Sequence, residues 1–445
     1  MRFGLYFVHQ LPRPWADGAE LNLFHEGLAQ VELADRLGID YAWVPEQHFL
    51  EEYSHSSAPE VFLAAASQRT SRIRLGHGVI LMPPGYNAPA RVAERVATMD
   101  LVSNGRVEFG VGDSKSRMEI EGFGITPDDR RAMSLEALEQ VADMLTMEPY
   151  PGFEGQYFSM PARNVVPKPA QRPHPPLWMA CSDDASIRLA ARLGVGALAH
   201  GFHDPDEAAR VVEDYYETFK RECVPIGHAV NPNVAMLNPF YCHADGHIAA
   251  QRGTEAAGFF TFAVRHYYSF GRHRPGRSDL WERYLAVRER FGGELPLRGS
   301  HAIGTPEEIA AHLRAFEEAG VDQTIFAHQA GRMDHEQVCE SLRLFGRDVL
   351  PGFAARAVEQ RRRKQQELEP YVAAALRRKA LMRAERGHRA IPACDAYGLG
   401  RADADLAALP EAIREQVAEL QRMKRIALRL DSEIEDGITG ETRPT

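Results

Sequence analysis

Cysteine is scarce in this chain of 445 residues, and the few cysteines lie far apart in the sequence. The five cysteines show no short spacing such as C-x-x-C and are odd in number, so neither a disulfide framework nor a zinc site is indicated. No run of about 18 uninterrupted apolar residues is present, which argues against a transmembrane helix. The chain also begins without the pattern of a signal peptide, and we therefore expect a cytoplasmic protein.

An excess of basic charge is also missing. The formal net charge of -10 at pH 7 argues against a general polyanion-binding surface, so nucleic acid is not expected as a partner. A composition of 44% hydrophobic and 26% charged residues is ordinary for a globular protein. The length allows one large core or two smaller ones.

Up to about residue 350, apolar strand-like runs alternate with amphipathic helical segments. This alternation is typical of a parallel sheet whose crossover connections are helices. It predicts an α/β fold of the (β/α)8 TIM-barrel type, whose active site lies at the carboxyl ends of the strands. The expected strands are Arg2–Val8, Tyr41–Val44, Ile73–Gly78, Arg106–Gly110, Leu177–Ala180, Gly196–Ala199, Val234–Tyr241 and Gln323–Ala327. The expected helices are 21–37, 59–69, 90–102, 133–145, 186–192, 205–221, 306–319 and 335–350.

An insertion, residues 253–300, interrupts this rhythm before the eighth strand. It is rich in aromatic residues and arginine, and an insertion of this length is often a substrate lid. The alternative is a helical excursion that packs on its own barrel or on a partner subunit. Both interpretations stay open at this point.

The alternation stops after Pro351-Gly352. We therefore assign residues 1–355 to the barrel and 356–445 to a helical C-terminal extension. Its basic first part, 356–389, is either a docking arm for an acidic partner or a solvated helix pair that wraps the barrel or a neighbouring subunit. Residues 402–430 continue with helical spacing.

Chemistry is expected between Pro45 and Gly124. Two apolar runs there, Ile73–Met82 and Arg106–Gly112, end in small residues, and glycine at a strand end lets a flat ligand lie against the backbone. His48 follows the second expected strand, where a histidine can act as an acid or base near neutral pH. The alternative is an ordinary hydrogen-bonding histidine.

A second candidate site lies between the fifth expected strand and its helix, in the segment from Ser182 to Ser186. Free backbone N–H groups at a helix start can cradle a phosphate. The alternative is that Asp183 or Asp184 is simply the N-cap, and two carboxylates would repel a phosphate unless they point away.

Several stretches, in chain order, resemble the bacterial luciferase-like flavin-dependent monooxygenases. They span the expected barrel to about residue 350, and the C-terminal extension lies outside them. The matching stretches are Glu46–Phe49, Arg74–Pro83, Leu101–Gly112, Glu121–Gly124, Pro176–Ala180 and Gly304–Glu308.

The resemblance implies a barrel that takes reduced FMN (FMNH2) from a separate NAD(P)H:flavin reductase and reacts it with O2. A flavin C4a-peroxide would then insert one oxygen atom into a small or medium apolar organic substrate. The resemblance also implies a homodimer formed through barrel helices and a cis peptide bond between Gly78 and Val79. The flavin ring is expected over Gly78, Val79 and Gly110, and its phosphate at Ser182, Asp183 and Ser186.

The chain departs from the luciferase pattern at the site itself. Gln47 stands where the luciferase α chain has the first of two adjacent histidines, and an amide cannot serve as a general base. Either His48 takes over that role or Gln47 acts through hydrogen bonds alone. Asp113 stands where the luciferase has its phosphate-binding arginine, so Lys115 or Arg117 is expected to supply the missing charge.

The leading hypothesis from the sequence is therefore a two-component FMNH2-dependent monooxygenase. One alternative is a deazaflavin-dependent dehydrogenase or reductase, because related barrels bind that cofactor in the same groove. Another is a non-catalytic flavin-binding protein, suggested by Gln47 and Asp113. An apolar substrate cavity is expected from aromatic residues near the barrel mouth, and no metal is expected. These aromatic residues are Phe49, Tyr53, Tyr86 and Phe202.

Overall fold

The computed structural model describes residues 1–293, 295–386, 391–392, 394 and 410–439. The chain divides into two compact units, Met1–Ile391 and Pro392–Thr445. The first unit contains the barrel and also α12 (Leu350–Arg386), so the predicted C-terminal extension is split between the two units.

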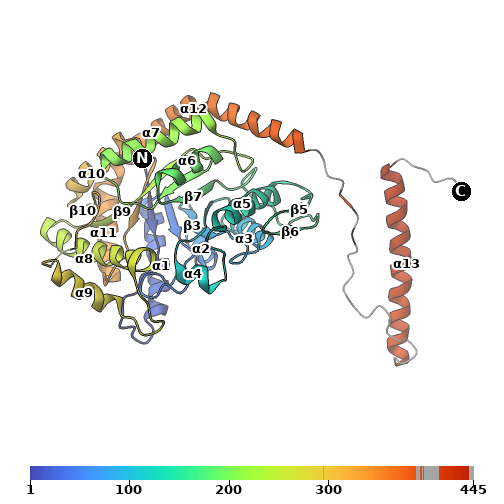
Figure 1. Ribbon diagram of the computed structural model, residues 1–445, viewed down its shortest axis with the longest axis horizontal. Coiled ribbons are helices and arrows are strands. Elements are labelled where there is room, and N and C mark those ends of the chain that lie inside the picture. The colour runs from blue at the N-terminus through green and yellow to red at the C-terminus, as the bar shows by residue number, and fades with distance from the viewer. Residues whose placement is uncertain (294, 387–390, 393, 395–409, 440–445) are drawn as a thin grey trace. The chain divides into compact units, whose positions relative to one another are not determined.

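The first unit is a closed barrel of parallel strands, as the sequence predicted. Neighbouring strands pair in the order β9, β11, β1, β2, β3, β4, β7, β8, and a pairing between β8 and β9 closes the ring. Figure 1 shows these strands in the middle of the unit with helices around them. The strands are β1 (Arg2–Tyr6), β2 (Tyr41–Val44), β3 (Arg74–Leu81), β4 (Val107–Gly112), β7 (Leu177–Cys181), β8 (Gly196–Ala199), β9 (Val234–Cys242) and β11 (Gln323–Ala327).

The crossover helices also lie where the hydrophobic spacing placed them. Local signals fix their starts: Asp204 and Thr305 each form a capping box with the glutamate three residues later, and a proline follows each cap. The helices are α1 (Ala19–Leu37), α2 (Pro59–Ser67), α3 (Pro89–Val102), α5 (Arg130–Thr146), α6 (Asp184–Leu193), α7 (Pro205–Glu222), α10 (Pro306–Glu318) and α11 (His335–Asp348).

The sequence did not predict the short elements that decorate the barrel. They are too short to show a clear hydrophobic period. They are α4 (Arg117–Gly122), the hairpin of β5 (Phe153–Glu154) and β6 (Ser159–Met160), and β10 (Ala302–Gly304), which pairs with the end of β9. The insertion begins earlier than predicted and contains α8 (Gly246–Arg265), the π-helix η1 (His266–Phe270) and α9 (Leu280–Arg290).

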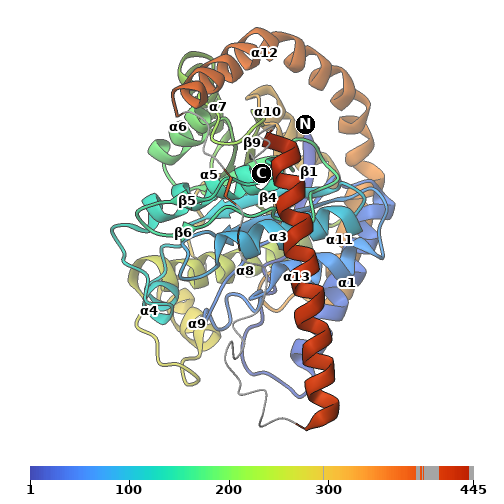
Figure 2. The ribbon, with the colours of Figure 1, turned by 90° about the vertical axis from the view of Figure 1, so that its right-hand side faces the viewer.

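The basic helix α12 wraps the barrel, packing against α7, α11 and β1 (Figure 1, Figure 2). Its cations are used as hydrogen-bond donors to the barrel: Lys364 Nζ donates to Asp322 and Asn233, and Arg378 Nε donates to the carbonyl of Cys223. The second unit holds α13 (Glu411–Thr439), and the predicted helical spacing at residues 402–409 falls outside the described residues.

Two tryptophans fill the barrel interior, and glycines on neighbouring strands make room for them. A Cβ atom at Gly76 would lie 2.2 Å from the Trp43 ring, and one at Gly4 would lie 2.9 Å from it. Trp178 covers Gly196 in the same way, because a Cβ atom at Gly196 would lie 2.3 Å from the Trp178 ring. The two indole rings meet edge to face at 5.3 Å. Glycine is therefore required on these strands by side-chain volume.

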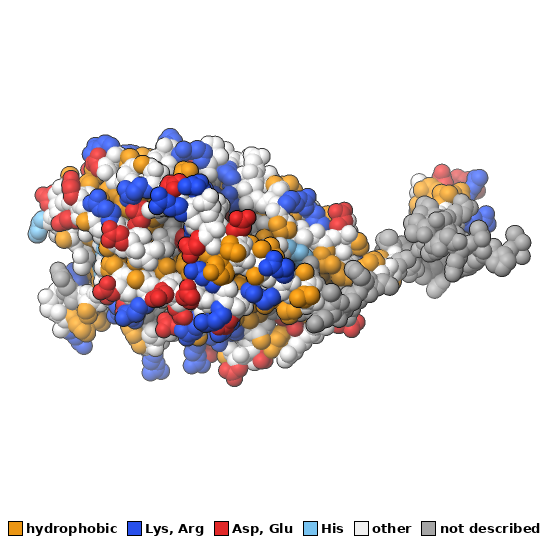
Figure 3. All heavy atoms as spheres, turned by 90° about the horizontal axis from the view of Figure 1, so that it is seen from above, with side chains coloured by type: hydrophobic (Ala, Val, Ile, Leu, Met, Phe, Trp, Pro, Cys, Tyr) orange, Lys and Arg blue, Asp and Glu red, His pale blue; other side chains and the backbone are white. Residues whose placement is uncertain are grey.

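The surface of the first unit mixes charges of both signs. Figure 3 shows basic and acidic side chains interspersed on the face it displays. Among the described residues, no helix has both the length and the apolar character needed to cross a bilayer.

Replacing Gly76 by alanine tests this packing. Gly76→Ala should lower the free energy of unfolding by about 1–3 kcal/mol, because the new methyl group overlaps the buried Trp43 ring. The matched control is Gly352→Ala on α12, where no atom lies within 4 Å of a Cβ. There the same substitution should raise stability by up to about 1 kcal/mol through helix propensity. Urea denaturation measures both, and equal effects would contradict the packing argument.

Candidate functional site

The buried carboxylate of Glu46 ties the end of β2 to the end of β3. It accepts the backbone N–H of Leu81 at 2.7 Å and the amide Nδ2 of Asn87 at 3.0 Å. The backbone N–H of Glu46 in turn donates to the carbonyl of Val79 at 2.8 Å. Arg95 Nη2 holds the other side of Asn87, donating to its Oδ1 at 2.5 Å. The backbone of β3 is thus held at Val79 by the backbone of Glu46 and, just after the irregularity, at Leu81 by the side chains of Glu46 and Asn87.

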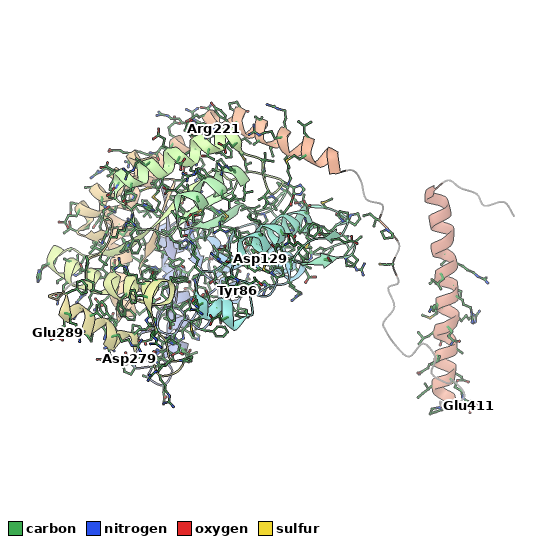
Figure 4. The ribbon with its side chains drawn as sticks, in the orientation of Figure 1. Tyr86, Asp129, Arg221, Asp279, Glu289 and Glu411 are labelled. Atoms are coloured by element: carbon green, nitrogen blue, oxygen red, sulfur yellow. The ribbon has the colours of Figure 1, made fainter. Side chains whose placement is uncertain are left out.

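His48 extends this network toward the barrel mouth. Its Nε2 donates to Glu46 Oε1 at 3.1 Å, which orients the ring. The ring packs edge to face on Phe123 at 4.8 Å and parallel to Tyr86 at 6.5 Å. Tyr86 lies beside α4 in Figure 4. The orientation of the imidazole is therefore fixed by a carboxylate on one side and by aromatic rings around it.

Glu119 on α4 holds the His48 loop from the other side. Its carboxylate accepts the backbone N–H of His48 at 2.8 Å and the hydroxyl of Ser114. Burial raises the pKa of Glu119 to about 7, and the nearby charge of Glu46 acts in the same direction, although the two hydrogen bonds lower it. Glu119, which holds the His48 loop, is therefore a carboxyl group that titrates near neutral pH.

The insertion is bonded to the loop that follows β2. Tyr268 on η1 donates its hydroxyl to Gln47 Oε1 at 2.9 Å. The buried Glu52 accepts the backbone N–H groups of Leu280 at 2.6 Å and Trp281 at 3.2 Å, at the start of α9. Aromatic residues of α8 continue the apolar cluster of the barrel interior. The insertion thus covers its own barrel and fixes the Gln47 amide.

A small cavity of about 10 Å³, which has room for about one water molecule, lies at the carboxyl ends of the strands. Of the predicted site residues, Gly78 contributes to its wall, which is mostly apolar. The residues that line it are Tyr6, Trp43, Gly78, Leu198, Ala199, His200, Leu237 and Ile325.

His200, which follows β8, brings a nitrogen base to this cavity. Its Nδ1 donates to the carbonyl of Leu198 at 3.0 Å, which leaves Nε2 as the acceptor in the neutral ring. Burial lowers the pKa of His200 below its ordinary value. The Tyr6 ring lies edge-on to the imidazole at 6.3 Å.

The peptide bond between Gly78 and Val79 is cis, as the resemblance implied. The register between β3 and β4 shifts at this point, between His77 and Ile80. Gly110 allows the two strands to approach, because a Cβ there would lie 2.2 Å from the His77 carbonyl oxygen. Backbone contact with β3 therefore accounts for glycine at this predicted flavin-contacting position.

The predicted phosphate segment forms a capped helix start with a lysine beside it. Asp183 is the N-cap of α6: its carboxylate accepts the Ser186 N–H at 2.9 Å, and this bond helps to lower the pKa of Asp183 to about 2. Lys115 Nζ donates to Ser182 Oγ at 2.5 Å and lies 3.4 Å from Asp183. The structure thus brings Ser182, Asp183, Ser186 and Lys115 together.

Arg117 lies apart from this cluster. Its guanidinium pairs with Glu121 one turn along α4, and its side chain is 88% exposed. The charge of Asp113 is balanced by Arg131 at 2.7 Å and Arg130 at 3.8 Å. The acidic residue at the luciferase arginine position is therefore neutralised locally.

The predicted substrate aromatics fall into two groups. Tyr53 and Phe202 both pack on Phe260 of α8, at 5.8 Å and 6.3 Å. Phe49 packs on Phe123 at 5.4 Å, as Tyr86 does at 4.9 Å, and the Phe49 ring is 52% exposed. The first group closes the mouth from the insertion, and the second forms a rim around His48.

Sequence reasoning missed several residues of the site. Tyr6, Trp43 and His200 line the cavity, and Arg131 neutralises Asp113. His200 could have been found from the sequence, because it directly follows an expected strand and the carboxyl ends of the strands form the mouth of a barrel. Tyr6 and Trp43 instead look in the sequence like ordinary buried residues of a strand.

The fold and the mouth of this barrel define the class, and comparison with known proteins agrees. The luciferase-like monooxygenase family matches residues 1–323. The chain therefore belongs to the luciferase-like monooxygenase family. This confirms the expected fold and the expectation of an oxidoreductase of this class.

Individual relatives extend the match. The chain is 26% identical over 365 residues to the oxygenase component of a flavin-dependent trigonelline monooxygenase from Acinetobacter baylyi, covering 81% of this chain and 98% of that protein. It is 38% identical over 137 residues to limonene 1,2-monooxygenase from Rhodococcus erythropolis, covering 30% of this chain and 35% of that protein. The crystal structure of monooxygenase RslO1 from Streptomyces bottropensis superposes with a TM-score of 0.65 and 27% identity, covering 79% of this chain and all of that one.

The raised pKa of Glu119 predicts a pH dependence of stability. Between its ordinary value of 4.5 and about 7, the unfolded chain ionises while the folded one stays protonated, so stability falls as pH rises. From pH 4.5 to pH 8, the wild type should lose about 3 kcal/mol relative to Glu119→Gln.

Urea denaturation at several pH values measures this difference. The control is Glu121→Gln, whose side chain is 63% exposed and whose profile should follow the wild type. Parallel profiles for wild type and Glu119→Gln would contradict the assignment.

Proposed function

We propose that this protein is the oxygenase of a two-component FMNH2-dependent monooxygenase that acts on a small or medium apolar organic molecule. The observation that carries the proposal is a helix start with a lysine, a hydroxyl and free backbone N–H groups, together with the small apolar cavity at the barrel mouth. The apolar wall suits the face of a flat ring, which needs the mouth to widen beyond this small cavity, and the helix start suits a phosphate. The names of the trigonelline and limonene relatives support flavin-dependent oxygenation.

The residues of the phosphate segment fit the group. Lys115 and Ser182 supply a cation and a hydroxyl. The backbone N–H groups of Asp184 and Ala185, in the first turn of α6, have no hydrogen-bond partner among the described residues. The Asp183 carboxylate is engaged by Ser186, so its charge is partly satisfied inside the cap. A phosphate would take up the remaining donors.

The walls of the mouth are apolar, as the proposed substrate requires. Trp43, Leu237 and Ile325 give the cavity apolar walls, and Phe260 of α8 covers the mouth together with Tyr53 and Phe202. Such walls exclude water from the reacting atoms. When bound, reduced FMN would supply the activation of O2, which these side chains cannot perform themselves.

Named side chains would manage protons and orientation. His48, whose Nε2 is held by Glu46, is proposed to donate or accept a proton at Nδ1 or to orient the reacting group. Gln47 is proposed to position by hydrogen bonding, with Tyr268 holding its Oε1. His200 offers Nε2 as a neutral base at the cavity wall.

A separate NAD(P)H:flavin reductase is proposed as the source of reduced FMN. The trigonelline relative is named as an oxygenase component, which supports a division of labour between two proteins. In this arrangement the flavin would arrive already reduced and bind as a co-substrate.

The deciding experiment supplies the purified protein with reduced FMN, isotopically labelled O2 and a panel of terpenes and N-methylated heteroaromatic acids. We expect one labelled oxygen atom in the product of at least one compound, and no labelled product without the protein. Labelled product without the protein, or none from any compound, would count against the proposal. Anaerobic reduction of a bound deazaflavin by an alcohol would instead assign the dehydrogenase alternative.

The phosphate site is tested by two neighbouring cations. Lys115→Ala should weaken FMN binding by about tenfold or more, corresponding to about 1.4 kcal/mol, because Lys115 lies against Ser182. Arg117→Ala is the control and should change the affinity by less than about twofold, because Arg117 pairs with Glu121. Flavin fluorescence titration measures both. A larger loss from Arg117→Ala would place the phosphate elsewhere.

A further inference from the structure

Helix α13 carries an apolar stripe with a seven-residue period. One row of positions at this interval consists of Ile413, Leu420 and Ala427. A second row lies three residues after the first and consists of Gln416, Met423 and Leu430. These are the a and d positions of a heptad repeat. A strict seven-residue period keeps one seam facing a partner helix only if the two helices supercoil, so it indicates a coiled coil.

The stripe is exposed along its described length. Leu420 is 60% exposed and Met423 is 57% exposed. The long helix α12 differs, because it buries Leu368 and Ala375 completely or nearly so. Most of the stability of a protein helix comes from packing of its apolar face, so α13 needs a partner. In the sequence the same period continues at Leu406, Leu409 and Ile434.

We propose that the partner is a second copy of this chain, with the two α13 helices forming a parallel, in-register coiled coil. In this register Gln416 meets Gln416 of the other copy, and the two amides can hydrogen-bond to each other. A shift by one heptad would set each Gln416 against an apolar residue. A single polar pair in a seam fixes register and orientation in this way.

Charge complementarity favours the same arrangement. Glu419 lies at a g position and Lys424 at the e position of the next heptad. In a parallel dimer these two positions face each other across the seam, so each copy contributes to two Glu–Lys pairs. In an antiparallel pair, g faces g and e faces e, so Glu419 and Lys424 would not meet. The resemblance to luciferases implied a dimer through barrel helices, and α13 provides a separate surface.

The test measures the mass of the full-length protein by size-exclusion chromatography with light scattering, and it needs no cofactor. Leu420→Glu places a charge in the seam and should halve the mass. Leu428→Glu is the matched control, because Leu428 is also an exposed leucine of α13 at 57% but lies at a b position, off the stripe. It should leave the mass and the circular dichroism unchanged, whereas Leu420→Glu should also lose part of the helix signal, because α13 then lacks its partner.

A mass that Leu420→Glu leaves unchanged, a monomeric wild type, or an equal effect of both substitutions would overturn the proposal. The stripe would then be covered by the chain's own barrel or by an unrelated protein.

Cysteine cross-linking tests the orientation. In a chain carrying Cys394→Ser, Leu420→Cys should form a disulfide-linked dimer under mild oxidation, because identical a positions meet in a parallel in-register pair. Leu428→Cys is the control and should stay uncross-linked. Dimers without the Leu420→Cys cross-link would rule out the parallel in-register arrangement.

Discussion

The candidate site depends on the buried carboxylate of Glu46. It receives hydrogen bonds from the backbone of β3, from Asn87 and from His48, so it joins two strand ends and the catalytic candidate in one network. Hydrogen bonds to an ionised group contribute more than neutral ones, and several on one buried carboxylate hold the surrounding backbone in a single arrangement. Without Glu46, neither the bend of β3 nor the ring of His48 would have a fixed position.

A second carboxylate acts on the same loop in a different way. Glu119 receives fewer donors than Glu46 and lies in a more apolar place, and burial therefore raises its pKa to about 7. The His48 loop is thus held on one side by a multiply bonded group and on the other by one that titrates near neutral pH.

Packing inside the barrel explains why the mouth is hollow and apolar. Trp43 occupies the space that side chains at Gly4 and Gly76 would fill, and it forms part of the cavity wall. The insertion then adds Phe260 and Tyr268 above the strand ends. The Trp43 ring thus determines both where the strands must carry glycine and part of the surface that faces the barrel mouth.

The sequence by itself determined the barrel, because each strand and crossover helix carries its own hydrophobic period and its own local stop signals. The alternation is local, and it predicted the order of the barrel strands and crossover helices correctly. The helical period of α13 is local in the same sense, since a heptad can be read without a partner.

Only the tertiary structure decided which side chains meet. Lys115 and Arg117 are two residues apart, yet Lys115 reaches Ser182 while Arg117 turns to Glu121. His200 and Trp43 line one cavity although half of the barrel strands, β3, β4, β7 and β8, separate them in the chain. Contacts of this kind depend on strand register, side-chain volume and burial across the closed sheet, and no local pattern in the sequence encodes them.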